Sequence, residues 1–157
     1  MQEVSVVIPN FNGMAYLDGV LSSLERQTIR NFEVILVDNG YTDGSCAFVS
    51  AEYPWVHMIQ LPENYGFSRA VNEGIRAARS PYVLLLNNDT EVITPQWLEN
   101  LMGYCQREDV AIVGAKLLYP DNTVQHAGVV VGIAGFAGHI LTGYDRNAMG
   151  YLWRLGV

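Results

Sequence analysis

The chain has 157 residues, of which 50% are hydrophobic and 16% are charged. That length and composition suffice for one domain with a buried core, and they exclude a globally disordered chain. The formal net charge of −7 argues against a general nucleic-acid or anionic-membrane surface. If such an acidic protein binds a phosphate ester, a divalent cation is the simplest way to offset the like charges, with Arg69 as a second source of positive charge.

Strands and helices are predicted to alternate along the first part of the chain. Apolar runs bounded by turn residues predict strands at residues 4–8, 32–37, 56–61, 82–86 and 110–113. Helical spacing of apolar residues predicts helices around 17–24 and over 45–52, 68–79 and 95–105. The alternation implies right-handed crossovers and therefore an α/β fold, a mostly parallel open sheet flanked by helices.

Local details of these elements are also predicted. Pro9 is expected to break the first strand, and Asn12 and Asp43 to cap the helices that follow them. The inward face of the helix over 68–79 is expected to carry Ala70, Val71, Gly74, Ile75 and Ala78.

The character of the chain changes from Lys116 onward. Pro120-Asp121-Asn122 predicts a turn, Val129–Val131 predicts a strand, and the glycines after it predict a long glycine-rich loop. We therefore divide the chain into an α/β part, residues 1–115, and a strand-and-loop part, residues 116–157.

The two ends of the chain give expectations about its location. Met1-Gln2-Glu3 lacks the basic region of a signal peptide, and no stretch approaches the roughly 20 apolar residues that span a membrane. We expect a cytoplasmic domain, or one bound peripherally at the inner face of the membrane. The apolar ending Trp153–Val157 has no cap or polar tail, which favours a truncated chain over a natural terminus docked on the core.

The most informative feature is Asn87-Asn88-Asp89, which directly follows the apolar run Tyr82–Leu86. Open parallel sheets bind ligands at the carboxyl ends of their strands, so a carboxylate there is well placed. Mg²⁺ or Mn²⁺ takes oxygen ligands from one or two carboxylates and completes its shell with phosphate oxygens and water. Asp89 fits that role, and a simple turn or helix cap is the competing interpretation.

A second strand end has the same pattern, because Phe32–Val37 runs into Asp38-Asn39-Gly40. Asp38 either forms the turn for which this tripeptide is common or hydrogen-bonds a base or ribose. The segment Asn64–Arg69 opens a predicted helix, so its free N–H groups and Arg69 can meet a phosphate. A solvated surface position is the competing interpretation for Arg69.

The histidines and cysteines carry no motif. His57 is expected to pack or lie at the surface, and a binding role for His126 and His139 has no spacing to support it. Cys46 and Cys105 fall in predicted helices without paired spacing, so we expect free buried thiols in a reducing compartment. The sequence also lacks a nucleophile elbow, a P-loop and the tight-turn glycines of a dinucleotide fingerprint, which disfavours an oxidoreductase.

Several motifs occur in one order along the chain. They are Val-Val-Ile-Pro-Asn-Phe-Asn-Gly (6–13), Gln27-Thr28, Phe-Glu-Val-Ile-Leu-Val-Asp-Asn-Gly (32–40), Thr-Asp-Gly-Ser (42–45), Asn64-Tyr65-Gly66-Phe67, Asn72-Glu73-Gly74 and Leu86-Asn87-Asn88-Asp89-Thr90. As a set they resemble the amino-terminal half of the family 2 glycosyltransferases, which have the GT-A fold, over roughly residues 4–115. Gln125–Gly128 and the glycines after it resemble bacterial members that build rhamnose-containing or related surface polysaccharides of the cell envelope.

The resemblance implies inverting transfer of a sugar from a UDP- or dTDP-linked donor to a glycan or lipid-linked acceptor. By position, Asp38 matches the acid that hydrogen-bonds the base or ribose. Asp89 matches the last acid of the Asp-X-Asp motif that binds Mg²⁺ or Mn²⁺. The candidate nucleotide-binding residues are Pro9, Asn10, Phe11, Asp38, Asn64, Gly66, Arg69, Asn72, Asn87 and Asn88.

Departures from the family pattern qualify these implications. Asn87 replaces the first Asp of the metal motif, so the site loses one charge, and Tyr41 stands where members usually have a small residue. The family takes its general base from a later segment that this chain does not reach. Asp145 is the only carboxylate side chain after Asp121 and matches no motif, so we expect the chain alone to bind a donor without transferring sugar.

Two other functions compete with this interpretation. One is a noncatalytic nucleotide-binding or assembly domain, which a measurement of sugar release separates from an enzyme. The other is a sugar-phosphate nucleotidyltransferase, which should show a glycine-rich basic loop after the first strand. Residues Pro9–Gly13 contain no basic residue.

Overall fold

The computed structural model describes residues 3–133 and 135–149, and of Ile133 only the backbone. The expectations that rest on Met1-Gln2 and on Trp153–Val157 concern residues outside that range. The chain divides into two compact units, residues 1–100 and 101–157, which are described separately. No helix in the described range is long and apolar enough to cross a membrane.

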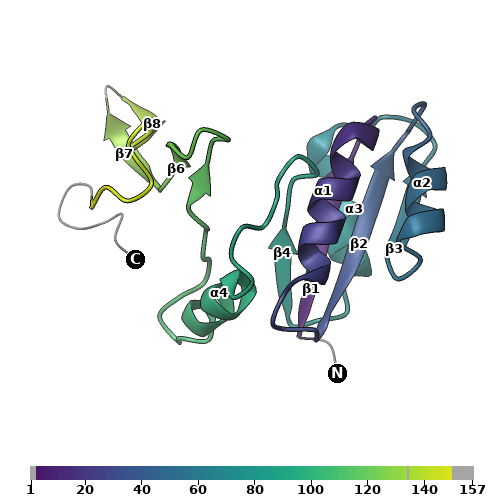
Figure 1. Ribbon diagram of the computed structural model, residues 1–157, viewed down its shortest axis with the longest axis horizontal. Coiled ribbons are helices and arrows are strands. Elements are labelled where there is room, and N and C mark those ends of the chain that lie inside the picture. Colours follow the sequence, from purple (N-terminus) through teal and green to yellow (C-terminus); the bar gives the residue numbers. More distant parts are fainter. Residues whose placement is uncertain (1–2, 134, 150–157) are drawn as a thin grey trace. The chain divides into compact units, whose positions relative to one another are not determined.

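The first unit is built on a four-stranded parallel sheet (Figure 1). Its strands are β1 (Val4–Asn10), β2 (Phe32–Asn39), β3 (His57–Leu61) and β4 (Tyr82–Leu85), in the spatial order β3-β2-β1-β4. Most residues of β1 and β2 are buried, as continuous apolar strands covered on both faces should be. The expected α/β fold with an open parallel sheet is confirmed.

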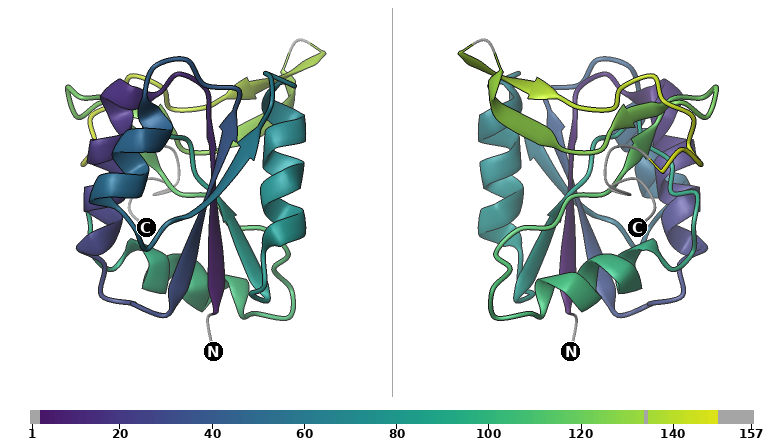
Figure 2. Two further views of the ribbon diagram at one scale, coloured as in Figure 1. Left: turned by 90° about the vertical axis from the view of Figure 1, so that its right-hand side faces the viewer. Right: turned by 90° about the vertical axis from the view of Figure 1, so that its left-hand side faces the viewer.

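Helices cover both faces of this sheet (Figure 2). α1 (Met14–Glu25) and α2 (Ser45–Glu52) lie on one face, and α3 (Phe67–Ala77) lies on the other. The chain advances from β1 to β2 to β3 and then returns to β4 on the far side of β1. Right-handed crossovers made in opposite directions place their helices on opposite faces. Gly74 lets α3 approach closely, since a Cβ there would lie 2.3 Å from Cγ1 of Val7.

The prediction that Pro9 breaks the first strand is wrong. β1 continues to Asn10 and stays paired with β2 over its whole length. The backbone oxygen of Val7 accepts a hydrogen bond from the Leu86 N–H, so Val7 directs its backbone groups toward β4. Pro9, two residues later, faces the same side, where β4 has already ended. Its missing N–H therefore costs the sheet no hydrogen bond.

The predicted cap of α1 is also wrong. Asn12 does not cap the helix, because its Oδ1 accepts a hydrogen bond from the Thr42 N–H at 2.8 Å. Asp43 serves the starts of two helices instead. Its Oδ2 accepts from the Met14 N–H of α1 at 2.9 Å, and its Oδ1 accepts from the Ser45 N–H of α2 at 3.0 Å.

Replacing Asp43 with Ala should therefore lower the free energy of unfolding by about 1–2 kcal/mol at neutral pH, the range expected for a lost helix cap. Burial alone would raise the pKa of Asp43, but hydrogen bonds from Met14 and Ser45 hold it below the ordinary value of 3.8. A carboxylate whose pKa is lowered in the folded state stabilises the fold at pH values above its ordinary pKa. This contribution to the free energy of unfolding disappears as the pH falls through the folded-state pKa.

Urea unfolding of the wild type and Asp43→Ala at pH 7 and at pH 2.5–4 measures this difference. The difference in free energy of unfolding between the wild type and Asp43→Ala should disappear at acidic pH. Glu63→Ala, which removes an exposed acid of the same unit, should unfold with the same free energy as the wild type at both pH values. An Asp43→Ala deficit that is equal at every pH would contradict a role for the ionised carboxylate.

Some expectations farther along the chain differ from the structure. Ile75 is 41% exposed rather than inward, whereas Ala70 and Val71 are buried as predicted. Residues 110–113 form no strand, and Ile112 is 90% exposed. A short apolar run forms a strand only when it pairs with another, and this one pairs with no other described residues. The predicted helix is present as α4 (Trp97–Cys105), and both cysteines are free.

The second unit contains two small antiparallel pairs. β5 (Leu117–Leu118) pairs with β6 (Val124–His126), and the predicted turn between them is confirmed by the hydrogen bond from the Asn122 N–H to the Tyr119 oxygen. β7 (Val129–Ile133) pairs with β8 (Phe136–His139). The strand predicted at 129–131 is therefore confirmed. The glycine-rich segment after it is not a loop throughout, because Phe136–His139 form β8 and Gly138 pairs with Val130.

Candidate functional site

The carboxyl ends of β1, β2 and β4 form the candidate site. The strand order reverses between β1 and β4, because the chain leaves β1 toward β2 but returns on its other side. Pairing of β1 with β4 stops at Val7 and Leu85, whereas β1 continues to Asn10. Open α/β sheets bind ligands in the crevice at such a reversal. The predicted residues Asn10, Asp38 and Asp89 all follow or end strands at this edge.

A chain of side-chain hydrogen bonds crosses the reversal. Asn88 Nδ2 donates to Asn10 Oδ1 at 2.8 Å, which joins the segment after β4 to the end of β1. Asn10 Nδ2 lies 3.3 Å from both Asp38 Oδ1 and Ser45 Oγ and donates to them. Asn10 and Asp38 are buried, with 2% and 0% of their surfaces exposed. The structure thus brings three of the predicted residues into direct contact.

The carboxylate of Asp38 is only half satisfied. Its Oδ1 accepts from Asn10, whereas its Oδ2 is buried without a hydrogen-bond partner in the described chain. The Cys46 thiol lies beside this carboxylate. Burial raises the pKa of that thiol to about 11, and the charge of Asp38 and a hydrogen bond to its carboxylate add to the effect. A buried polar atom without a partner typically costs about 1–3 kcal/mol. A ligand donor would therefore be stabilising at Oδ2, provided that the side chains covering it move.

Sequence reasoning missed Gly13 and Ser45 as parts of this arrangement. A Cβ at Gly13 would lie 2.2 Å from both Asn10 Oδ1 and Asn88 Nδ2, so only glycine leaves room for their hydrogen bond. Ser45 was predicted only as the start of a helix. Both belonged to the family motifs, but their neighbours across the sheet could not be inferred from spacing.

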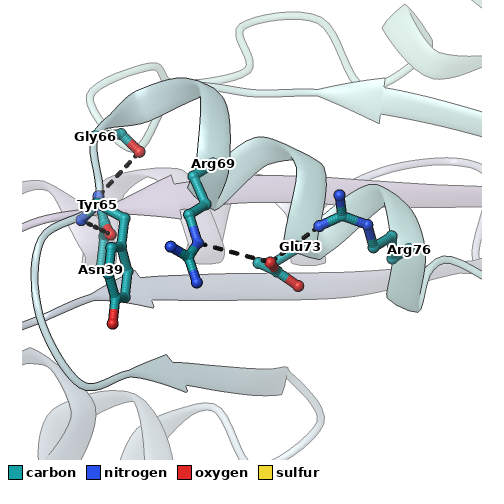
Figure 3. A network of polar contacts seen from close by, with 6 residues as sticks. All are labelled: Asn39, Tyr65, Gly66, Arg69, Glu73 and Arg76. Carbon is teal, nitrogen blue, oxygen red and sulfur yellow. Dashed lines mark hydrogen bonds and ion pairs between the residues drawn. The ribbon is translucent and has the colours of Figure 1, made fainter.

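Asn39, also missed, fixes the loop before α3 (Figure 3). Its Nδ2 donates to Asn64 Oδ1 at 2.8 Å and to the Gly66 oxygen at 3.3 Å, while its Oδ1 accepts from the Tyr65 N–H at 2.9 Å. Gly66 has a φ of +84°, which favours glycine, and its N–H donates to Asn64 Oδ1 at 2.8 Å. The predicted residues Asn64 and Gly66 are therefore held against the end of β2.

Arg69 lies in the first turn of α3. Its guanidinium is 3.7 Å from the centroid of the Tyr65 ring, and its Nε is 4.0 Å from Glu73 Oε1, which also pairs with Arg76 at 2.9 Å (Figure 3). The Arg69 side chain is 55% exposed, so water screens the ion pair. An anion at the start of α3 can compete for this cation. Asn72 is exposed on the same helix.

Asp89 and some of the other predicted site residues are accessible. Asp89 and Asn87 are exposed, Phe11 is 48% exposed and Pro9 is partly buried. Within residues 3–133 and 135–149, no three His, Cys, Asp or Glu side chains form a group that could hold a metal. Asp89 therefore offers a single carboxylate. That fits a hard cation whose other ligands are phosphate oxygens and water, and it does not fit an all-protein cage.

A hollow of about 690 Å³ lies at the opposite end of the strands. It is lined by Phe32 and His57, which begin β2 and β3, and by charged residues that include Glu33 and Arg79. Burial would raise the pKa of Glu33, but hydrogen bonds from Ser5 Oγ and the Arg79 N–H lower it overall. None of the predicted site residues lines this hollow.

Comparison with known proteins assigns the chain to a class. The model of glycosyl transferase family 2 matches residues 5–131, and the chain belongs to that family. The O-antigen biosynthesis protein RfbC of Myxococcus xanthus is 39% identical over 140 residues, which cover 87% of this chain and 11% of RfbC. The chain therefore spans only about a tenth of that relative's length.

Solved structures share the fold. S. aureus TarS 1-349 superimposes with a TM-score of 0.61 and 26% identity over 66% of this chain and 32% of that TarS fragment. TarS has also been solved with UDP and with UDP-GlcNAc. The mannosyltransferase PcManGT from Pyrobaculum calidifontis, solved with GDP-Man and Mn²⁺, gives a TM-score of 0.63 at 23% identity over 69% of this chain and 33% of PcManGT. The expected GT-A fold is confirmed.

Proposed function

We propose that residues 1–115 form the donor half of an inverting glycosyltransferase and that residues 116–157 lead toward its acceptor half. The donor is a nucleoside diphosphate sugar, UDP- or dTDP-linked, and the acceptor is a glycan or lipid-linked chain of the cell envelope. The observation that carries the proposal is the hydrogen-bonded chain Asn88–Asn10–Asp38 at the strand reversal, with an unpaired carboxylate oxygen at its end. The UDP complexes of TarS and the role named for RfbC support it.

Each predicted residue has a role in this proposal. Asp38 receives a hydrogen bond from the base or ribose, and Pro9, Asn10 and Phe11 surround the base. The start of α3 and Arg69 face the diphosphate. The remaining residues around the nucleotide are Asn64, Gly66, Asn72, Asn87 and Asn88.

Asp89 would hold a divalent cation, Mg²⁺ or Mn²⁺, between the acidic protein and the diphosphate. The accessible carboxylate after β4 fits such a group, and PcManGT was solved with Mn²⁺. When bound, the cation supplies positive charge that stabilises the departing diphosphate. Asp89 orients that charge, and Arg69 adds its own at the start of α3.

Calorimetric titration of the chain with UDP and with dTDP tests the proposal. Either UDP or dTDP should bind in the presence of Mn²⁺. The same nucleotide should bind at least about tenfold more weakly in EDTA, because contacts to charged groups are worth about 1.5–3 kcal/mol. Asp89→Asn should reproduce the EDTA result in Mn²⁺. Glu108→Gln, which neutralises an exposed acid of the second unit, should bind as the wild type does.

The possible failures point to different parts of the proposal. Absence of binding for both nucleotides would contradict the donor role. Equal affinity in Mn²⁺ and EDTA would remove the cation and leave the nucleotide site. A metal requirement that survives Asp89→Asn would assign the cation to another ligand.

A further inference from the structure

Two histidines of the second unit meet nitrogen to nitrogen. His126 ends β6 and His139 ends β8, and their Nδ1 atoms lie 2.8 Å apart. The two rings are nearly perpendicular, at 80°, with centroids 5.0 Å apart. Neither residue belongs to the candidate donor site, and no sequence motif predicted that they would be in contact.

Backbone hydrogen bonds hold both histidines in place from the neighbouring positions. Val124 lies two residues before His126. Its backbone oxygen accepts a hydrogen bond from the Gly143 N–H, and its N–H donates one to the Tyr144 oxygen, both at 2.8 Å. Ile140, next to the second histidine, donates to the Gly128 oxygen at 3.3 Å. Backbone hydrogen bonds outside the strand pairs thus hold the segments that carry the two histidines, which lowers the cost of bringing two ligands to one point.

The contact has two chemical interpretations. A neutral imidazole has one N–H and one nitrogen with a free lone pair, so a direct hydrogen bond requires the Nδ1 proton on one ring only. If both rings carry their proton on Nε2, two lone pairs converge and can share a cation. Two nitrogens bound tetrahedrally to one Zn²⁺ at 2.0–2.1 Å are about 3.3 Å apart, so the rings would have to separate by about 0.5 Å from their 2.8 Å contact to admit the ion.

We infer that His126 and His139 form a two-histidine binding site for a divalent transition metal, with Zn²⁺ as the probe ion. Imidazole nitrogen suits Zn²⁺, Ni²⁺ and Cu²⁺ and is a poor match for Mg²⁺, so this site differs in chemistry from the oxygen site proposed at Asp89. No third His, Cys, Asp or Glu joins the pair within the described residues. Water or a donor atom of another molecule completes the metal's shell.

The test is a Zn²⁺ titration of the untagged 157-residue chain by competition with a chromophoric chelator. The wild type should bind one ion. His126→Gln and His139→Gln should each weaken binding by about 100-fold or more, because a second ligand on the same scaffold raises affinity by about 10²–10⁴-fold. His57→Gln removes the third histidine of the chain and should bind as the wild type does. Asp89→Asn should also be unchanged.

Nitrogen NMR of the imidazole rings reports on the site without any substitution. Zn²⁺ should shift the Nδ1 resonances of both histidines together and leave Nε2 protonated. A wild type that binds Zn²⁺ no better than His126→Gln or His139→Gln, or Nδ1 resonances that do not respond, would overturn the inference and leave a hydrogen-bonded pair. Loss of binding in Asp89→Asn would also overturn it, by moving the metal to the donor site.

Discussion

The 157-residue chain should bind a nucleoside diphosphate sugar but transfer the sugar about 10²–10⁴-fold more slowly than a family member with its general base, since that is the usual contribution of general-base assistance. After Asp121 the only carboxylate side chain is Asp145. Its Oδ1 accepts from the Asn147 N–H at 2.8 Å, and its backbone bridges to Thr123, so it is engaged in a turn. An incomplete acceptor pocket would also remove the contribution of positioning.

A radiolabelled-donor assay measures this, with the chain and a longer family member given the same acceptor extract. Sugar released to water must be counted apart from sugar transferred, because water can enter an open site. Transfer by the chain at the rate of the longer protein would contradict the prediction. In that case Asp145→Asn would show whether this residue is the base.

Removing the acceptor oxygen of Asp38 should weaken nucleotide binding by roughly 5- to 150-fold, equivalent to about 1–3 kcal/mol for an unpaired buried partner. Asp38→Asn is the sharper variant. Its amide oxygen can still accept from Asn10, while an NH₂ group replaces the unpaired Oδ2. Asp38→Ala loses both interactions and should bind more weakly still.

Calorimetry with uridine, UDP and dTDP separates the contributions to binding. The loss should be similar for uridine and UDP, since Asp38 is proposed to bind the nucleoside, and the effect of Mn²⁺ should persist. Glu33→Gln neutralises an acid at the opposite end of β2 and should bind normally. Wild-type affinity in Asp38→Asn would leave Asp38 as a residue that only orients Asn10.

The sequence predicted best what depends on long apolar runs. The strands around Val34 and Leu84 and the helix over 45–52 occur where their patterns placed them. In β2 the reason is continuous burial, which needs continuous apolar residues. The errors concern elements that depend on distant partners. Residues 110–113 are apolar but unpaired, and Pro9 is tolerated only because β4 stops before it.

In the candidate site, too, the sequence predicted the features that depend on local motifs and missed those that depend on distant partners. Motif order placed Asn10, Asp38 and Asn88 at strand ends, and the structure joins them by hydrogen bonds. Gly13 must lack a side chain because of the separation of two strands. Asn39 can anchor a loop because of where α3 begins. Neither distance is encoded in local spacing. Nor did any pattern in the sequence indicate the contact between the second unit's two histidines.

The short β4 has a consequence for the behaviour of the chain in solution. β4 is an outer strand of the four-stranded sheet, and its side chains Val83 and Leu85 are 41% and 51% exposed. An outer strand presents unpaired N–H and C=O groups to any extended segment it meets, and apolar side chains beside them strengthen the encounter. Within the first unit, this edge is therefore where an extended segment of another molecule can add to the sheet, by the same backbone pairing that holds β4 to β1.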